Sequence, residues 1–185
     1  MNTIYFITGN SGKVKEVQEK FKDFNIKIVQ KNLGYPEIQA DTIKEVAKYG
    51  LEFLKNKINK PFILEDAGIF IKGLKDFPGV YSKYVFYTIG NEGILKLLEE
   101  KENRNAIFRS VYAYYSEDGE TKYFLGECKG LISTKSKGNN GFGYDPIFIP
   151  NNQNKTFAEM DLNEKNKYSH RGKAIDELIK SIIKD

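Results

Sequence analysis

The segment TIYFITGNSGKVKEVQEKFKDF, residues 3–24, decides the fold class of this chain. Its first five residues are a short β-rich apolar run, which predicts a buried strand. A glycine-bearing loop follows at residues 8–12, and apolar side chains then recur at positions 14, 17, 21 and 24. Spacings of three and four place these side chains on one face of a helix over residues 13–24. The chain therefore opens with a strand, a glycine turn and a helix.

The same patterns continue to the end of the chain. A capping box between Thr42 and Glu45 predicts the start of a helix that runs to about residue 57, and the SEDG sequence at 116–119 predicts a hairpin turn. Without repeats or linkers, we expect one mixed α/β domain with a central sheet, spanning residues 1–185. The other expected elements are strands at 26–30, 62–65, 69–71, 106–115, 121–126, 130–133 and 147–149, and helices at 91–101 and 169–184.

Composition narrows the class of protein. Of the 185 residues, 40% are hydrophobic and 29% are charged, which is typical of a globular chain with a real core. The net charge of +4 favours a polyanionic ligand, but lysines interleaved with glutamates form no basic block of the nucleic-acid-binding kind. A single cysteine, Cys128, favours a reducing cytoplasm. The N-terminus resembles no signal peptide, and no apolar run approaches the roughly 20 residues of a membrane span.

The glycine loop predicts a phosphate site. A turn between a strand and a helix points backbone N–H groups at the helix start, where phosphate oxygens bind well, and Lys13 adds a cation. The spacing differs from the Walker A pattern, and Val14 stands where that pattern needs a hydroxyl for magnesium. The structural alternative is a plain strand-to-helix turn. The candidate residues are Thr8, Gly9, Asn10, Ser11, Gly12 and Lys13.

Adjacent acids suggest a metal site. Glu65 and Asp66 follow an apolar strand, and carboxylates are unfavourable in strand interiors. Beside phosphates they suit Mg²⁺, and one of them can accept a proton from an attacking water. Glu37 is a third acid, on a proline-shaped loop. The alternative is an acidic turn before Gly68.

Two later segments suggest recognition of a base. In the first, glycines allow close approach to a flat ligand, Phe142 and Tyr144 can stack, and Asp145 can accept hydrogen bonds. The second contains His170, the one histidine of the sequence, next to Arg171 at the expected start of the last helix. Donors at a helix start suit an anion or a carbonyl oxygen. The alternatives are an aromatic-rich turn and a structural histidine.

Taken in order, seven segments resemble the inosine triphosphate pyrophosphatase family, also called Ham1-like. Their sequences are most similar to those of archaeal members. They are TGNSGK at 8–13, PEIQ at 36–39, LEDAG at 64–68, FPGVYS at 77–82, FGYDPIF at 142–148, TFAEM at 156–160 and SHR at 169–171.

The resemblance implies an activity and an architecture. Deaminated purine nucleoside triphosphates (ITP, dITP and XTP) would be hydrolysed to the monophosphate and pyrophosphate, cleansing the nucleotide pool. The implied fold is an elongated two-lobed α/β domain around a long curved mixed sheet, with flanking helices and a central cleft. Family members are homodimers that need Mg²⁺.

It also implies roles for individual residues. Thr8 to Lys13 would bind the triphosphate, with help from Lys48. Asp66 would be metal ligand and general base, and Glu37 would complete the metal site. The base would bind Phe142, Gly143, Tyr144, Asp145, Lys165, His170 and Arg171. Ala67 is a departure, because many members have serine there; its backbone N–H would still contact the substrate.

Two other functions stay open at this point. A Maf-like pyrophosphatase would act on other modified or pyrimidine triphosphates, but the SHR and FGYD segments disfavour it. A nucleic-acid-binding module would be compatible with the basic charge and the many aromatic residues, yet no signature of the common RNA- or DNA-binding modules is present.

Overall fold

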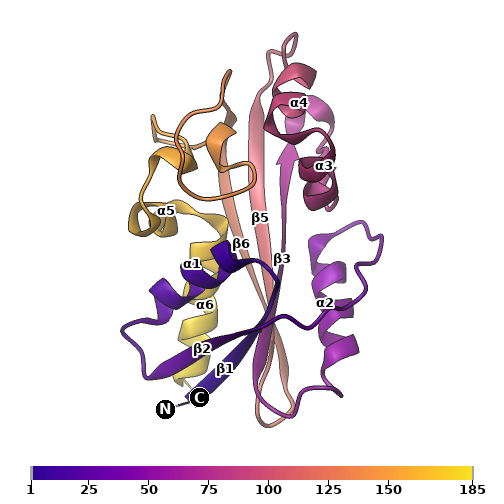
Figure 1. The fold of residues 1–185 in the computed structure, drawn as a ribbon, viewed down its shortest axis with the longest axis vertical. Coiled ribbons are helices and arrows are strands. Elements are labelled where there is room, and N and C mark those ends of the chain that lie inside the picture. Colours follow the sequence, from indigo (N-terminus) through magenta and orange to yellow (C-terminus); the bar gives the residue numbers. More distant parts are fainter. Residues whose placement is uncertain (1, 185) are drawn as a thin grey trace. The chain divides into compact units, whose positions relative to one another are not determined.

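The computed structural model describes residues 2–184, and their strands join in one seven-stranded mixed sheet (Figure 1). The strand order is β2-β1-β3-β5-β6-β7, with β4 paired to β3. This confirms the predicted α/β class. The strands are β1 (Asn2–Ile7), β2 (Ile26–Lys31), β3 (Phe62–Ile71), β4 (Pro78–Gly79), β5 (Asn105–Tyr115), β6 (Thr121–Ile132) and β7 (Phe148–Pro150), and the helices are α1 (Ser11–Phe21), α2 (Ile43–Leu54), α3 (Ser82–Thr88), α4 (Gly90–Leu97), α5 (Leu162–Tyr168) and α6 (His170–Lys184).

The chain divides into two compact units. The described residues of unit 1 are 2–66, 110–126 and 171–184, and those of unit 2 are 67–109 and 127–170. Strands β3, β5 and β6 each contribute residues to both units. Each unit has its own hydrophobic core, so each is described separately below.

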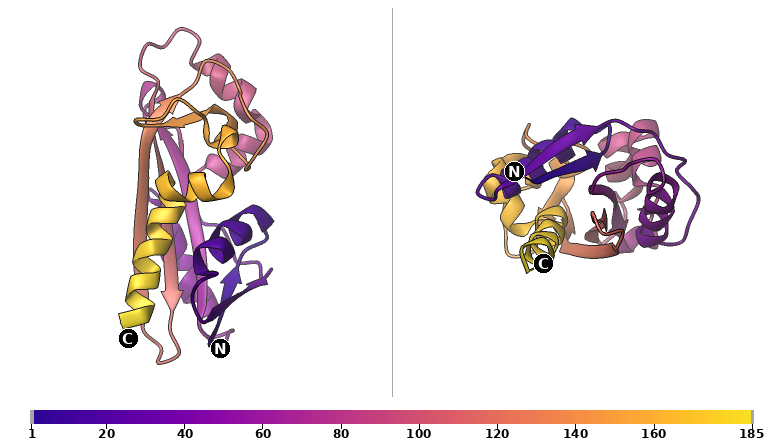
Figure 2. Two further views of the ribbon diagram at one scale, coloured as in Figure 1. Left: turned by 90° about the vertical axis from the view of Figure 1, so that its left-hand side faces the viewer. Right: turned by 90° about the horizontal axis from the view of Figure 1, so that it is seen from below.

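Unit 1 is built on the strand–turn–helix segment that opens the sequence. β1 pairs in parallel with β2 and with the start of β3. Helices α1 and α6 both bury apolar side chains in its core, and the rings of Phe6 and Tyr112 pack with centroids 5.9 Å apart. β1 begins and α6 ends at the same end of this unit (Figure 2).

Unit 2 has an aromatic core. Phe108 packs edge-on against Phe148 at 4.7 Å between centroids, and Phe148 packs against Phe157 at 5.1 Å. Helices α3 and α4 lie next to each other in this unit (Figure 1), and Val85 and Ile94 are their buried apolar contributions. Because Phe and Tyr bury large areas, a few rings fill much of this core.

One expected break in the sheet is wrong. The strands predicted at 62–65 and 69–71 form the single strand β3. Gly68 is part of that strand because the backbone of β4 packs directly against this glycine. A Cβ on Gly68 would lie 2.3 Å from the Gly79 carbonyl oxygen. The Ser82 hydroxyl donates to that oxygen at 2.6 Å and accepts from the Ile69 N–H at 2.8 Å. The acidic pair thus lies inside a strand.

Other local expectations differ in smaller ways. The capping box of α2 is confirmed, with Glu45 accepting from the Thr42 N–H at 2.9 Å. The strand expected at 130–133 is the end of β6. Helices α3 and α5 were not predicted, because each has seven residues and too few buried positions for a helical period.

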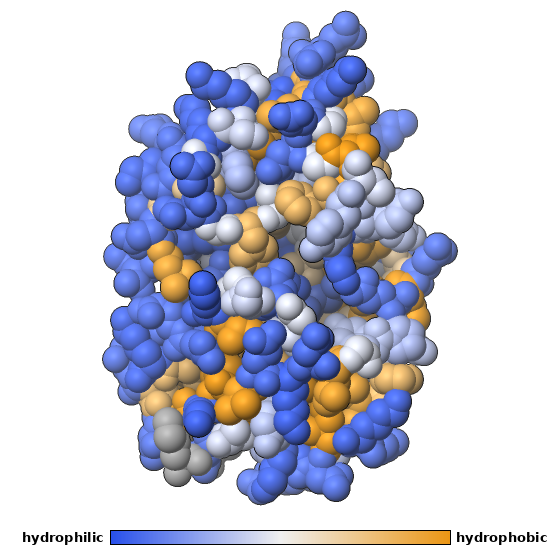
Figure 3. Space-filling view, viewed as in Figure 1, coloured by the Kyte–Doolittle hydropathy of each residue, from blue (hydrophilic) through white to orange (hydrophobic). Residues whose placement is uncertain are grey.

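The surface agrees with the charged composition. On the face seen in Figure 3, hydrophilic residues predominate and the hydrophobic ones form separate patches. None of the helices within residues 2–184 is both long and apolar enough to cross a membrane.

Candidate active site

The glycine loop of unit 1 leads into the N-terminus of α1. Asn10 caps the helix, since its side-chain oxygen accepts from the Lys13 N–H at 3.1 Å. The Thr8 hydroxyl accepts from the Asn10 N–H at 3.1 Å, and Gln30 donates to the Thr8 carbonyl at 2.9 Å. The backbone N–H groups of Ser11 and Gly12 lie in the first turn, before the intrahelical bonds begin. The loop therefore has the fixed geometry of an anion site.

Lys13 connects this loop to β3. Its ammonium lies 2.5 Å from Oε2 of Glu65 and donates to the Glu65 carbonyl oxygen at 3.3 Å. The lysine side chain is 19% exposed, whereas the glutamate side chain is inaccessible. A buried carboxylate thus holds a partly exposed cation at the helix start.

Glu65 belongs to a buried charge network in unit 1. The Ser110 hydroxyl donates to Oε1 of Glu65 at 2.8 Å. The guanidinium of Arg171 donates to the same oxygen at 3.1 and 3.2 Å, and its other arm donates to Glu16 at 2.6 Å. Glu16, Glu65 and Arg171 are at most 4% exposed. Buried charges persist only when they are paired and hydrogen-bonded, as these are.

The network changes the acidity of Glu65. Burial alone would raise the pKa of its carboxyl, but the charges of Arg171 and Lys13 and the hydrogen bonds from Lys13 and Ser110 lower that pKa to about 2. Burial would likewise lower the pKa of the Arg171 guanidinium, yet Glu65 and Glu16 raise it above its ordinary value. Glu65 therefore stays ionised at neutral pH.

We expect this shift to appear in the pH dependence of folding. The pKa of Glu65 is lower in the folded chain than the ordinary 4.5. Its contribution to the free energy of unfolding is therefore complete above pH 4.5 and is lost as the pH falls towards 2. Urea unfolding of the wild type and of Glu65→Gln should differ most at neutral pH and converge on acidification. Glu100→Gln, at an exposed position, is the matched control and should show no such convergence.

Asp66 lies on the opposite face of β3 from Glu65, because neighbouring side chains of a strand alternate. It is half-buried, as is Ala67, whereas Glu37 is exposed on the loop before α2. Burial raises the pKa of the Tyr35 phenol, and the negative charges of Asp66, Glu37 and Glu65 raise it further.

The donor chemistry fits a hard cation. Arg171, Ser110 and Lys13 surround Glu65, so Asp66 and Glu37 are the candidate metal ligands among the three predicted acids. Within residues 2–184, no three His, Cys, Asp or Glu side chains gather into a metal-binding group. Two carboxylates completed by waters and phosphate oxygens are the arrangement that Mg²⁺ prefers. Lys48 is exposed on α2, the helix that follows Glu37.

The predicted base-binding segment forms a tight loop in unit 2. Oδ2 of Asp145 accepts from the Phe142 N–H at 2.7 Å and from the Lys165 ammonium at 2.5 Å. That ammonium lies 4.8 Å from the centroid of the Phe142 ring. Gly141 is required here: its φ is 75°, and a Cβ would lie 2.1 Å from Oδ2 of Asp145. The structure thus brings Phe142, Asp145 and Lys165 together.

Two other candidates of unit 2 lie in its core. Tyr144 is buried, packs edge-on against Phe86 at 5.4 Å, and donates its hydroxyl to the Ser82 carbonyl at 2.9 Å. His170 is 2% exposed and stacks on Phe108, with the rings 4.5 Å apart and 7° from parallel. Gly143 accepts from Asn91 through its carbonyl at 3.1 Å. These contacts fix the loop and the start of α6.

Several residues in and beside the buried charge network were not predicted from the sequence. Glu16 lies away from the apolar stripe of α1, so helical periodicity leaves it in solvent, although it is buried against Arg171. Ser110 is a small polar residue inside a long apolar strand. This contrast with its neighbours is the sequence signal that could have identified it. Tyr112 lies beside this network, where burial and then Glu65 raise the pKa of its phenol well above the ordinary value.

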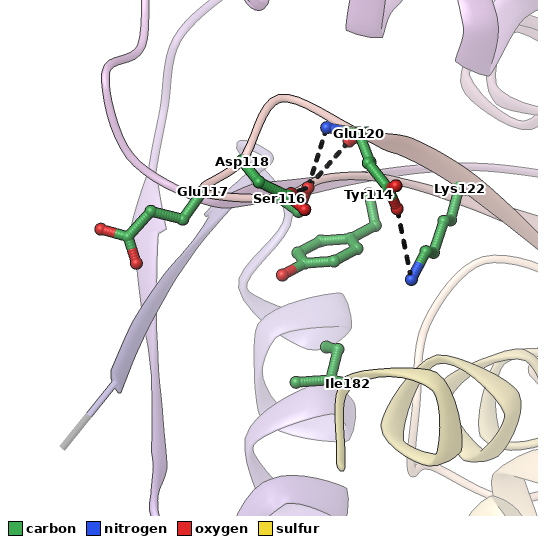
Figure 4. Close-up of a pocket in the computed structure, with 7 residues that line it drawn as sticks. All are labelled: Tyr114, Ser116, Glu117, Asp118, Glu120, Lys122 and Ile182. Atoms are coloured by element: carbon green, nitrogen blue, oxygen red, sulfur yellow. Dashed lines mark hydrogen bonds and ion pairs between the residues drawn. The ribbon is translucent and has the colours of Figure 1, made fainter. Parts of the chain in front are cut away.

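A hollow at the tip of the β5–β6 hairpin is not a candidate for a nucleotide. It lies in unit 1, and its lining includes the acids Glu117, Asp118 and Glu120 with one cation, Lys122 (Figure 4). Glu117 points away from the other labelled side chains in that view. Like charges repel, so three carboxylates disfavour a polyanionic triphosphate.

Comparisons with known proteins show what the chain is similar to. The chain is 54% identical to the dITP/XTP pyrophosphatase of Pyrococcus horikoshii over 172 residues, which is 93% of this chain and 92% of that protein. The corresponding protein of Thermococcus kodakarensis is 51% identical over 172 residues, with the same coverage. The solved structure of a HAM1 protein from Coxiella burnetii matches with a TM-score of 0.87 and 30% identity, covering 100% of both chains.

A protein-family model matches nearly the whole chain. It describes the Ham1 family and matches residues 4–181, which include the glycine loop, the acidic pair and the segments around Asp145 and Arg171. The identities to the relatives extend over nearly the whole chain. The chain therefore belongs to the Ham1 family.

Proposed function

We infer that this chain is a nucleoside triphosphate pyrophosphohydrolase that converts ITP, dITP and XTP to the monophosphate and pyrophosphate. One observation carries the inference: the anion-binding loop of unit 1 holds Lys13 against the strand that bears Asp66. Curated relatives at 51% and 54% identity are dITP/XTP pyrophosphatases. We further propose that residues 1–185 act as one domain, in the cytoplasm, which the single cysteine supports.

We propose that Glu37 and Asp66 hold Mg²⁺. Both are carboxylates of unit 1, and Asp66 is half-buried whereas Glu37 is exposed. Magnesium, when bound, would neutralise charge that develops on the phosphate oxygens. The triphosphate would contact the backbone of Thr8, Gly9, Asn10, Ser11 and Gly12 and the ammonium groups of Lys13 and Lys48. The Ala67 N–H would add a backbone donor.

Three side chains of unit 1 have separate roles in the proposed hydrolysis. Asp66 orients the attacking water and accepts its proton. Lys13 stabilises the negative charge on the departing pyrophosphate. Glu65 keeps Lys13 in place, because the lysine ammonium is paired to a carboxylate that Arg171 and Ser110 fix from the other side. The α–β phosphate bond breaks and the monophosphate keeps the new oxygen.

We propose that the segments around Asp145 and His170 recognise the base. Phe142 stacks on it, with Gly143 and Tyr144 shaping the loop, and Asp145 and Lys165 supply polar contacts. His170 and Arg171 belong to the segment proposed to recognise the 6-oxo oxygen. A site that donates to this oxygen leaves a donor unpaired when adenine's amino group arrives, which can reject ATP by up to ~10⁴-fold.

Turnover of single nucleotides tests this function. With Mg²⁺ present, ITP, dITP and XTP should release pyrophosphate at much higher kcat/KM than GTP or CTP. Release of orthophosphate would contradict cleavage between the α- and β-phosphates. Preference for CTP would favour a Maf-like activity, and nucleic-acid binding without turnover would favour a binding module.

We also propose that the chain forms a homodimer. The family resemblance suggests it, and exposed aromatic residues on α3 of unit 2 support it: Tyr84 and Tyr87 are 71% and 78% exposed. Large exposed aromatic side chains are enriched where proteins associate. Light scattering on a size-exclusion column should give twice the mass of one chain; a mass of one chain across the micromolar range would contradict the proposal.

A further inference from the structure

We propose that Tyr35 is a positioning residue: its ring, seated on Gly50 of α2, holds the preceding loop so that Glu37 faces the metal. This inference rests on the proposed metal role of Glu37 and names what places that side chain. All residues concerned belong to unit 1.

The loop that carries Glu37 is irregular and mostly exposed. Residues 32–40 form neither helix nor strand, and Leu33, Gly34, Pro36 and Glu37 are exposed. Tyr35, Ile38 and Ala40 are half-buried, and Tyr35 has the largest side chain of the three. A segment without regular hydrogen bonds needs a side-chain contact to fix its position. The tyrosine ring supplies such a contact, two residues before the carboxylate.

Gly50 provides the seat for the ring. The buried positions of α2 include Val46, Ala47, Gly50, Leu51 and Leu54, so Gly50 lies on the apolar stripe where a side chain would ordinarily pack. A Cβ built on Gly50 would lie 2.7 Å from Cε2 of Tyr35, 3.0 Å from Cδ2 and 3.1 Å from Cζ. Real Cβ atoms essentially never approach within 3.0 Å. The ring therefore occupies the space that the missing side chain leaves.

A glycine in a helix interior is otherwise unfavourable, because it is a far poorer helix former than alanine. Its presence on the buried stripe of α2 is explained by the close approach of the ring. Pro36 has a restricted φ, which stiffens the connection between the seated ring and Glu37.

The test is Gly50→Ala, which should affect helix stability and metal affinity in opposite directions. Alanine favours the helix, so the thermal midpoint should stay level or rise. Its methyl group should displace the Tyr35 ring and weaken Mn²⁺ binding, the probe for Mg²⁺, by roughly tenfold, as loss of a residue that orients a ligand commonly does. Mn²⁺ affinity is measured by electron paramagnetic resonance without turnover. Gly34→Ala is the matched control, because a Cβ there meets nothing within 4 Å; it should bind Mn²⁺ like the wild type.

Variants at Tyr35 complete the design. Tyr35→Phe keeps the ring and should bind Mn²⁺ within about twofold of the wild type, whereas Tyr35→Ala should lose roughly tenfold. If one contact is responsible, the double variant Tyr35→Ala/Gly50→Ala should lose no more than the weaker-binding single variant. Wild-type Mn²⁺ affinity in both Gly50→Ala and Tyr35→Ala would overturn the inference.

Glu37→Gln separates this inference from the proposed function. If it weakens Mn²⁺ binding while the Tyr35 and Gly50 variants do not, Glu37 is a ligand and the positioning role is wrong. If Glu37→Gln binds Mn²⁺ normally, the proposed metal role of Glu37 is wrong, and the positioning inference falls with it.

Discussion

Asp66→Asn should reduce kcat for ITP by roughly 10⁴-fold, the upper range for loss of a general base. Asparagine keeps the size of the side chain but removes the negative charge and the ability to accept a proton. Asp66 is half-buried on the face of β3 opposite Glu65, so the exchange should leave the network around Arg171 intact. Pyrophosphate release under saturating ITP and Mg²⁺ measures the effect.

Two controls make this result specific. Glu100→Gln removes a carboxylate from an exposed position of unit 2 and should retain wild-type turnover. The thermal midpoint of Asp66→Asn should remain near that of the wild type, which shows that the loss is chemical. Turnover within tenfold of the wild type would remove Asp66 from the roles of metal ligand and base.

Arg171→Met should lower the free energy of unfolding by about 3–5 kcal/mol, the usual cost of removing one partner from a buried ion pair. The guanidinium bridges Glu16 and Glu65, which are both buried. Without it, both carboxylates remain in the core and lose this shared cation, although Lys13 still pairs with Glu65. Urea unfolding at pH 7 measures the change.

The pairing can be separated from any role of Arg171 in recognising the base. Arg171→Lys keeps the charge but cannot reach both carboxylates with one ammonium, so its loss should be intermediate. Glu16→Leu/Arg171→Met removes one of the stranded carboxylates and should recover part of the stability. Arg171→Met with wild-type stability and a raised KM for ITP would instead assign this residue to the base alone.

Local signals in the sequence predicted much of the fold. Alternation and apolar runs located β1, β2, and the β5–β6 hairpin, and the capping box located the start of α2. Such features depend on residues within about one turn or one strand of each other, so they can be predicted from the local sequence. The predicted division of β3 at Gly68 was wrong. The backbone of Gly79, in the next strand, packs against that glycine, and the local sequence around Gly68 does not show this contact.

The candidate site was predicted in part. Lys13, Asp66, Asp145 and Lys165 stand in motifs whose chemistry is visible in the residue types. Glu16 and Tyr35 were not found, since no local pattern distinguishes a buried glutamate on a helix or a tyrosine seated on a glycine. Glu16 pairs with Arg171, which is distant in the chain, and the role proposed for Tyr35 depends on its contact with Gly50 of the next helix.

The sequence by itself determined the α/β class, the glycine turn before α1 and the family to which the chain belongs. Tertiary structure alone decided how the adjacent acids divide. Both are carboxylates in one strand, but strand geometry turns them to opposite faces. Packing then encloses Glu65 between Arg171, Ser110 and Lys13 and leaves Asp66 half-buried. The physical reason is that burial and charge pairing depend on which distant segments meet, which no local pattern records.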